Sequence, residues 1–196
     1  MLHPEYLNWR KKIKPDLNTI EGREQVMEKM DGAFTTYHLP SLPKTIPDNA
    51  VSILLEKFYK LNDVKRILKE HQLAMASENF VGYLLELYIF SVAHNYGWVL
   101  CPDSIFKSVD FVKQNPDGTW HMLQIKNRSN SENSSSSKVR VGTTINKWFR
   151  SFSHKDISNW ENFPDKELNG QLSEEGFHSF IEMYLHKFMN DEFKLS

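Results

Sequence analysis

Hydrophobic and polar positions follow two different periods along this chain, and the change of period predicts where helices give way to strands. Before residue 95 the helical period is clearest in Phe80, Tyr83, Leu84, Leu87 and Tyr88. This stripe predicts a helix that starts near Ser77 and stops at Asn95-Tyr-Gly97, where glycine is a natural helix end. β-Branched and aromatic residues then concentrate in residues 98–101, 105–113 and 119–128, which predicts three strands.

Other segments also show the helical period. A helix is expected to open near residue 46 and run through Tyr59, and helical spacing resumes after Asn62-Asp63. In residues 144–152 the apolar positions fall at i, i+3, i+4 and i+7, so a helix with a basic opposite face is predicted there. A last helix is expected over residues 173–189. Residues 154–171 contain no clear strand, and residues 157–163 are the weak candidate.

The second and third strands flank Asn115-Pro-Asp-Gly118, a turn sequence that predicts an antiparallel hairpin. Residues two apart on a strand point to the same face, so Gln124 and Lys126 share one face. If Asp110 turns the same way, a carboxylate, an amide oxygen and an ammonium converge. Such a set suits phosphodiester hydrolysis, because two oxygen ligands hold Mg²⁺ while a lysine supports developing charge or orients the attacking water.

Each of these side chains also has a purely structural interpretation. Asp110 stands between Val109 and Phe111 in an apolar strand, where a carboxylate needs a partner, so the functional interpretation is favoured. Lys126 taken singly would be a solvated charge near a strand end. His121, on the same strand, is expected to be structural or exposed rather than a metal ligand.

Composition and charge narrow the function classes. The chain has 196 residues, of which 40% are hydrophobic, which fits one folded domain with a real core. Its formal net charge is -1, so any nucleic-acid surface must be local. The single cysteine, Cys101, excludes an internal disulfide and fits the cytoplasm. No apolar run approaches the length that spans a bilayer, so no membrane association is expected.

The order of a helix, a strand, an Asp-bearing strand and a Gln-x-Lys strand resembles the PD-(D/E)xK nuclease superfamily, over roughly residues 78–152. The resemblance implies an α/β (α+β mixed) fold, with a restriction-endonuclease-like central mixed sheet flanked by helices and a helical N-terminal region. Residues 1–196 would form one nuclease domain, with a catalytic core at 76–153 and a packed N-terminal extension at 1–75. Asp110 matches the first acid of the family, and Lys126 matches its lysine.

The chain departs from the family pattern at two places. Gln124 stands where an acid is usual, and no proline precedes Asp110. An amide oxygen can still ligate a hard cation but adds no charge, so the metal needs another carboxylate. Many family members carry a glutamate on the preceding helix, which implies Glu86 here, with Glu78 as the second choice.

Residues 126–150 have a narrower resemblance to SinI-type restriction endonucleases, which act on short GC-rich duplex sites with a central A·T or T·A pair. From composition alone, the polar stretch at 129–138 would be a flexible linker. The resemblance makes it a DNA-contact element instead, and it implies Mg²⁺, double-stranded DNA and a homodimer as partners. The DNA-contact candidates are Asn127, Arg128, Asn130, Asn133, Ser134, Lys138, Arg140, Thr143, Lys147 and Arg150.

Three other functions fit the same sequence. A repair or recombination nuclease of the superfamily would recognise DNA structure rather than sequence. A DNA-binding module with a degenerate nuclease fold is suggested by Gln124 and the near-neutral charge. In an interaction domain, the hairpin acid and lysine would merely pair.

Overall fold

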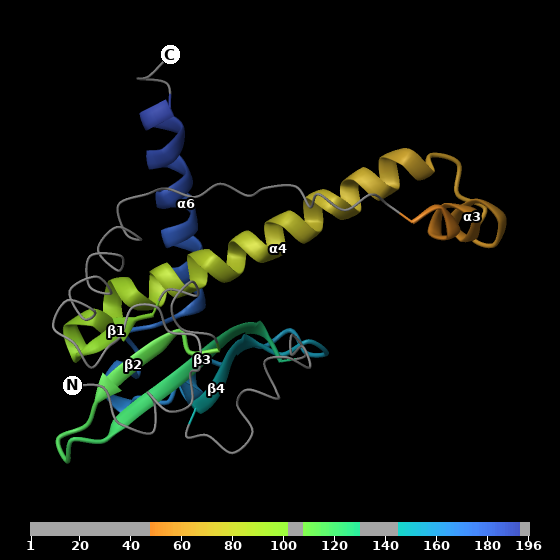
Figure 1. The fold of residues 1–196 in the computed structure, drawn as a ribbon. Helices are drawn as coiled ribbons and strands as arrows, with labels where there is room; N and C mark the ends of the chain where they lie inside the picture. Colours follow the sequence, from red (N-terminus) through yellow and green to blue (C-terminus); the bar gives the residue numbers. More distant parts are fainter. Residues whose placement is uncertain (1–47, 102–107, 130–144, 193–196) are drawn as a thin grey trace, which may run out of the picture. The chain divides into compact units, whose positions relative to one another are not determined.

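The computed structural model describes residues 48–101, 108–129 and 145–192, which fall into two compact units. One unit ends at Tyr83 and the other begins at Leu84, within a single long helix. The second unit holds a sheet with the helices η1 (His94–Tyr96), η2 (Trp160–Asn162), η3 (Lys166–Leu168) and α6 (Glu174–Glu192) (Figure 1).

The helices expected between residues 46 and 95 are present, and two of the predicted helices form one continuous helix. Helix α3 covers Asn49–Lys57, and its N-cap Asp48 accepts a hydrogen bond from Ala50 N–H at 2.8 Å. Helix α4 covers Val64–Ala93, so the two segments predicted separately, after Asn62-Asp63 and from Ser77, are continuous. It ends as predicted, because Gly97 takes a left-handed φ of 82° just after η1.

The sheet has four strands in the order β1-β2-β3-β4. Strands β1 (Trp98–Leu100), β2 (Phe111–Gln114) and β3 (Trp120–Arg128) are antiparallel neighbours. The predicted turn closes the hairpin: Gly118 N–H donates to the Asn115 carbonyl at 2.9 Å, with φ of 83° at the glycine. The mixed sheet with flanking helices confirms the expected fold class. The predicted start of the second strand, at residue 105, falls outside the described residues.

The predicted helix at residues 144–152 is wrong, because this segment forms strand β4 (Ile145–Ser151). It pairs parallel with β3, from Met122 opposite Ile145 to Arg128 opposite Ser151. The apolar positions follow a helical stripe, but pairing with β3 makes the segment a strand in which Ile145 and Trp148 are buried on opposite faces. Residues 157–163 contribute an isolated bridge, Ser151 with Ser158, and helix η2.

One face of the sheet packs on aromatic side chains from the C-terminal half of the chain. Trp148 of β4 lies 5.1 Å, centroid to centroid, from both Trp160 and Phe163. Tyr88 of α4 lies 5.6 Å from Trp160 and 5.6 Å from Phe177 of α6. The predicted stripe on the last helix is therefore core where it meets this cluster, which holds α4 and α6 against the sheet.

Asn159, which no sequence motif singled out, secures the outer edge of β4. Its side-chain N–H donates to the Phe149 carbonyl at 2.9 Å, and its backbone N–H donates to the Arg150 carbonyl at 2.6 Å. Its own carbonyl accepts from Trp148 Nε1 at 3.2 Å. Because Asn159 is only 7% exposed, its bonds to the Phe149 and Arg150 carbonyls satisfy backbone groups at an edge where the described residues place no further strand.

Replacing Asn159 by alanine is expected to lower the free energy of unfolding by about 1–3 kcal/mol, because the Phe149 carbonyl loses a buried donor. Denaturant unfolding of the full chain measures this loss. The matched control is Asn169→Ala, at an exposed position, which should change stability by less than about 0.5 kcal/mol. Equal stability of the two variants would contradict the anchoring role.

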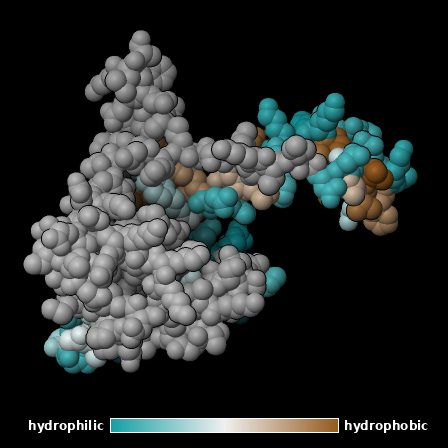
Figure 2. Space-filling view, viewed as in Figure 1, coloured by the Kyte–Doolittle hydropathy of each residue, from teal (hydrophilic) through white to brown (hydrophobic). Residues whose placement is uncertain are grey.

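The unit that ends at Tyr83 exposes apolar side chains on and after α3. None of the α3 residues is buried, and Ile53, Leu54, Phe58 and Tyr59 are each more than half exposed. Figure 2 shows this apolar surface interspersed with polar residues. Within the described parts of the chain, no helix combines the length and apolar character that crossing a membrane requires.

Candidate active site

Asp110 lies directly before β2, and its carboxylate reaches across to β3. Its backbone N–H donates to the Leu123 carbonyl at 2.9 Å, next to the regular Phe111–Leu123 pair. Its Oδ2 accepts a hydrogen bond from Ile125 N–H at 2.5 Å. Asp110 is only 6% exposed. The carboxylate is therefore held at the backbone of the residue that separates Gln124 from Lys126.

The chain enters this position through an unusual backbone conformation. Ser108, two residues before Asp110, has a φ of 62°, in the left-handed region that residues with side chains seldom adopt. Such conformations cost energy and are concentrated at functional sites. Sequence reasoning noted only the missing proline here.

Gln124 and Lys126 share a face of β3, as their spacing predicts. Gln124 is 1% exposed, and Lys126 is half-buried. The intervening Ile125 points to the opposite face together with its β4 partner Trp148, which belongs to the aromatic core. A buried amide and a half-buried ammonium thus flank the residue that binds the Asp110 carboxylate.

Strand β4 places further side chains on this face. Its parallel register pairs Gln124 with Lys147 and Lys126 with Phe149. Because partner residues on neighbouring strands point to the same face, Lys147 stands beside Gln124. The helix predicted for this segment hid that relation, because a helix has no strand register that would pair Lys147 with Gln124.

The two glutamates expected to complete a metal site both lie on α4. Glu86 is half-buried in the unit that contains the sheet, whereas Glu78 is exposed in the other unit. In the described residues, no three His, Cys, Asp or Glu side chains cluster closely enough to hold a metal ion by themselves. Asp110 and Gln124 nevertheless offer a carboxylate and an amide oxygen, and oxygen atoms are the type of ligand that hard divalent cations bind.

The residues expected to contact DNA occupy different positions. Arg128 is exposed at the end of β3. Arg150 Nε donates a hydrogen bond to Asn127 Oδ1 at 2.9 Å. The Arg150 guanidinium also forms an ion pair with Glu174 and lies over the Phe177 ring. Six other candidates lie outside the described residues: Asn130, Asn133, Ser134, Lys138, Arg140 and Thr143.

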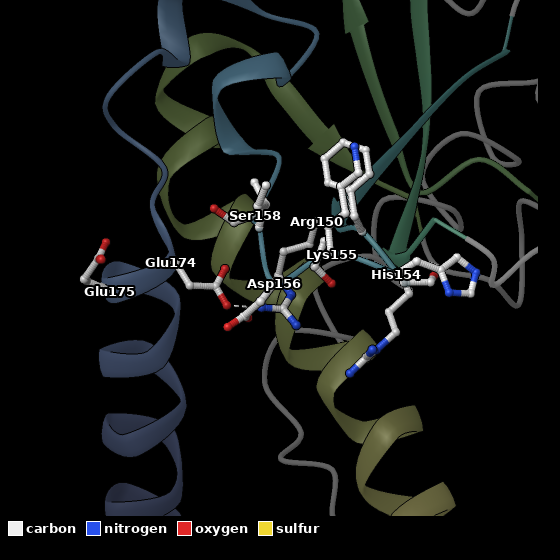
Figure 3. Close-up of a pocket in the computed structure, with 12 residues that line it drawn as sticks. Arg150, His154, Lys155, Asp156, Ser158, Glu174 and Glu175 are labelled. Atoms are coloured by element: carbon white, nitrogen blue, oxygen red, sulfur yellow. Dashed lines mark hydrogen bonds and ion pairs between the residues drawn. The ribbon is translucent and has the colours of Figure 1, made fainter.

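A hollow of about 760 Å³ opens beyond the end of β4, between residues 151–158 and the start of α6. Figure 3 shows Arg150 directed toward Glu174 there, with Asp156 near them. Its fully charged lining residues are three cations and three carboxylates: Arg128, Arg150, Lys155, Asp156, Glu174 and Glu175. Because the positive and negative side chains are equal in number, the lining does not favour an anionic or a cationic ligand. Asp110, Gln124 and Lys126 do not line the hollow.

A second charged cluster lies near the opposite end of β3 and is structural. Lys113 donates to Asp165 at 2.8 Å and to Glu167 at 2.7 Å, and Trp98 donates to Asp165 at 2.7 Å. Burial raises the pKa of the Asp165 carboxyl, but these hydrogen bonds outweigh it and hold the pKa below its usual range. His121 packs on the Trp98 ring, which agrees with a structural role.

The chain is similar to known proteins over most of its length. The family model of the SinI restriction endonuclease matches residues 2–187. The chain is 48% identical over 172 residues to the Type II restriction enzyme SinI of Salmonella infantis, and 43% identical over 172 residues to the Type II restriction enzyme Eco47I of Escherichia coli. Each alignment covers 85% of this chain and 75% of the relative. The chain therefore belongs to the SinI restriction endonuclease family, and it is a site-specific DNA endonuclease like these two Type II restriction enzymes.

Proposed function

We propose that this endonuclease hydrolyses duplex DNA with Mg²⁺ at a site built around Asp110, Gln124 and Lys126. The observation that carries the proposal is the hydrogen bond from Ile125 N–H to the Asp110 carboxylate at 2.5 Å. This bond supports one catalytic centre, because it brings the carboxylate to the strand segment that carries both other side chains. Type II restriction endonucleases generally need a divalent metal ion, which agrees with such a centre.

The proposed roles follow from the chemistry of each group. Asp110 and Gln124 would hold the metal through oxygen atoms, with Glu86 as a second carboxylate. When bound, the metal would polarise the scissile phosphoryl group and acidify a water molecule. Lys126 would orient the attacking water and oppose the charge that develops on the phosphoryl oxygens.

Recognition would come from the polar stretch after β3 and from the end of that strand. Arg128 is exposed there, and side chains of this kind bind phosphates and base edges. By its family resemblance, the site would be a short GC-rich duplex sequence with a central A·T or T·A pair. A symmetric site favours a homodimer whose two-fold axis matches that of the DNA. The cytoplasm, where incoming DNA is met, would be its place of action.

Incubation of the purified chain with unmethylated phage DNA tests the proposal. With Mg²⁺ we expect discrete fragments, and with excess EDTA intact DNA, because the phosphoryl chemistry loses its metal. Renewed addition of Mg²⁺ in excess over EDTA should restore the same fragments. Equal cleavage in EDTA would contradict the metal site, a continuous smear would contradict site-specific cleavage, and intact DNA throughout would contradict catalysis.

A further inference from the structure

Lys147 lies next to the proposed centre through the register of two parallel strands. The backbone pairing of β3 and β4 sets it directly opposite Gln124, with Lys126 opposite Phe149. Neighbouring strands lie about 4.8 Å apart, and directly paired residues share a face. The described sheet thus brings two lysines to the amide at position 124, one along the same strand and one across the strand pair.

The identity of residue 124 determines whether the β3 residue paired with Lys147 carries a negative charge. A carboxylate at this position, which is usual in the superfamily, would form an ion pair with an ammonium at the paired position on β4. The Gln124 amide carries no charge, so residue 124 itself forms no ion pair with Lys147. The Gln124 amide still has an oxygen that can bind a metal ion. Glutamine in place of an acid therefore removes one negative charge from the site without removing a ligand.

We propose that Lys147 is a second lysine of the cleavage site and binds the scissile phosphate together with Lys126. The inference rests on the proposed function. Lys147 is half-buried, as is Lys126, so its charge would act on the phosphoryl oxygens in a partly desolvated site, where electrostatic stabilisation is stronger than in water. A DNA phosphodiester is therefore its ligand, and charge that develops during hydrolysis is what it stabilises.

Single-turnover cleavage of a duplex that carries the recognition site, with enzyme in excess, separates this role from ordinary DNA contact. Lys147→Met should lower the rate by about 10²-fold, the cost of one electrostatic donor. Affinity for the same duplex in EDTA should fall by less than about tenfold, as for the loss of one phosphate contact. Lys147→Arg keeps the charge and should cut faster than Lys147→Met. Lys166→Met, at an exposed position on η3, is the matched control and should cut at the wild-type rate.

Position 124 provides an independent test. The effects of Gln124→Glu and Lys147→Met on the rate should be strongly non-additive, because a carboxylate at 124 would already engage the ammonium at 147. Additive effects, or a Lys147→Met rate within twofold of wild type, would overturn the proposal. The same holds if Lys147→Arg is no faster than Lys147→Met while thermal unfolding shows both variants folded. If the wild-type chain does not cut, the proposed function fails as well; if it cuts and Lys147→Met cuts equally, only the role of Lys147 fails.

Discussion

Replacing Lys126 by methionine is expected to abolish most DNA cleavage while leaving the fold and much of the DNA binding intact. Methionine fills the volume of the half-buried lysine stem but removes its ammonium, which we place beside the attacking water. Loss of one such group typically costs about 10²–10⁴-fold in rate. Single-turnover cleavage at saturating Mg²⁺ measures the effect, and a mobility shift of the same duplex in EDTA measures binding.

Two comparisons make this result specific. Lys166→Met removes an exposed lysine from η3 and should leave the rate unchanged. Thermal unfolding of both variants should match that of the wild type, because Lys126 contributes no core packing on the aromatic side of the sheet. Undiminished cleavage by folded Lys126→Met would remove this side chain from the mechanism.

Asp110→Asn is expected to show the second large loss, a fall in rate of at least about 10³-fold, since the metal would lose its central carboxylate. Asparagine is the informative replacement because its amide oxygen still accepts the hydrogen bond from Ile125 N–H. The fold should therefore survive while the charge is lost. Rates measured over a range of Mg²⁺ concentrations should show that excess metal does not restore the wild-type rate.

The alanine variant at the same position separates structure from catalysis. Asp110→Ala removes both the charge and the buried acceptor, so it should destabilise the fold by about 1–3 kcal/mol more than Asp110→Asn. Denaturant unfolding of the two variants measures this difference. Equal stability would mean that the hydrogen bond to β3 contributes little. Wild-type cleavage by Asp110→Asn would refute the metal-binding role of the carboxylate.

The sequence by itself determined the hairpin and the face that Gln124 and Lys126 share, because both depend on neighbours along the chain. The Pro-Asp-Gly turn sets the pairing of β2 with β3, and the two-residue period of a strand puts Gln124 and Lys126 on one face. Helix ends could be located because the capping residue Asp48 and the terminating Gly97 act on neighbouring backbone groups. The resemblance to SinI-type enzymes rested on these local elements and on the polar stretch that follows β3, and comparison with known proteins confirmed it.

Only the tertiary structure decided that residues 145–151 form a strand and that Lys147 lies next to Gln124. Apolar residues there have the spacing of a helical stripe, so local periodicity favours the wrong element. The choice comes from backbone hydrogen bonds to β3, about twenty residues earlier in the chain, and from Trp148 packing on Trp160 and Phe163. Asn159 then completes the edge of β4. Such long-range pairing leaves no periodic signal in the sequence, which is why the second lysine beside Gln124 emerged only from the fold.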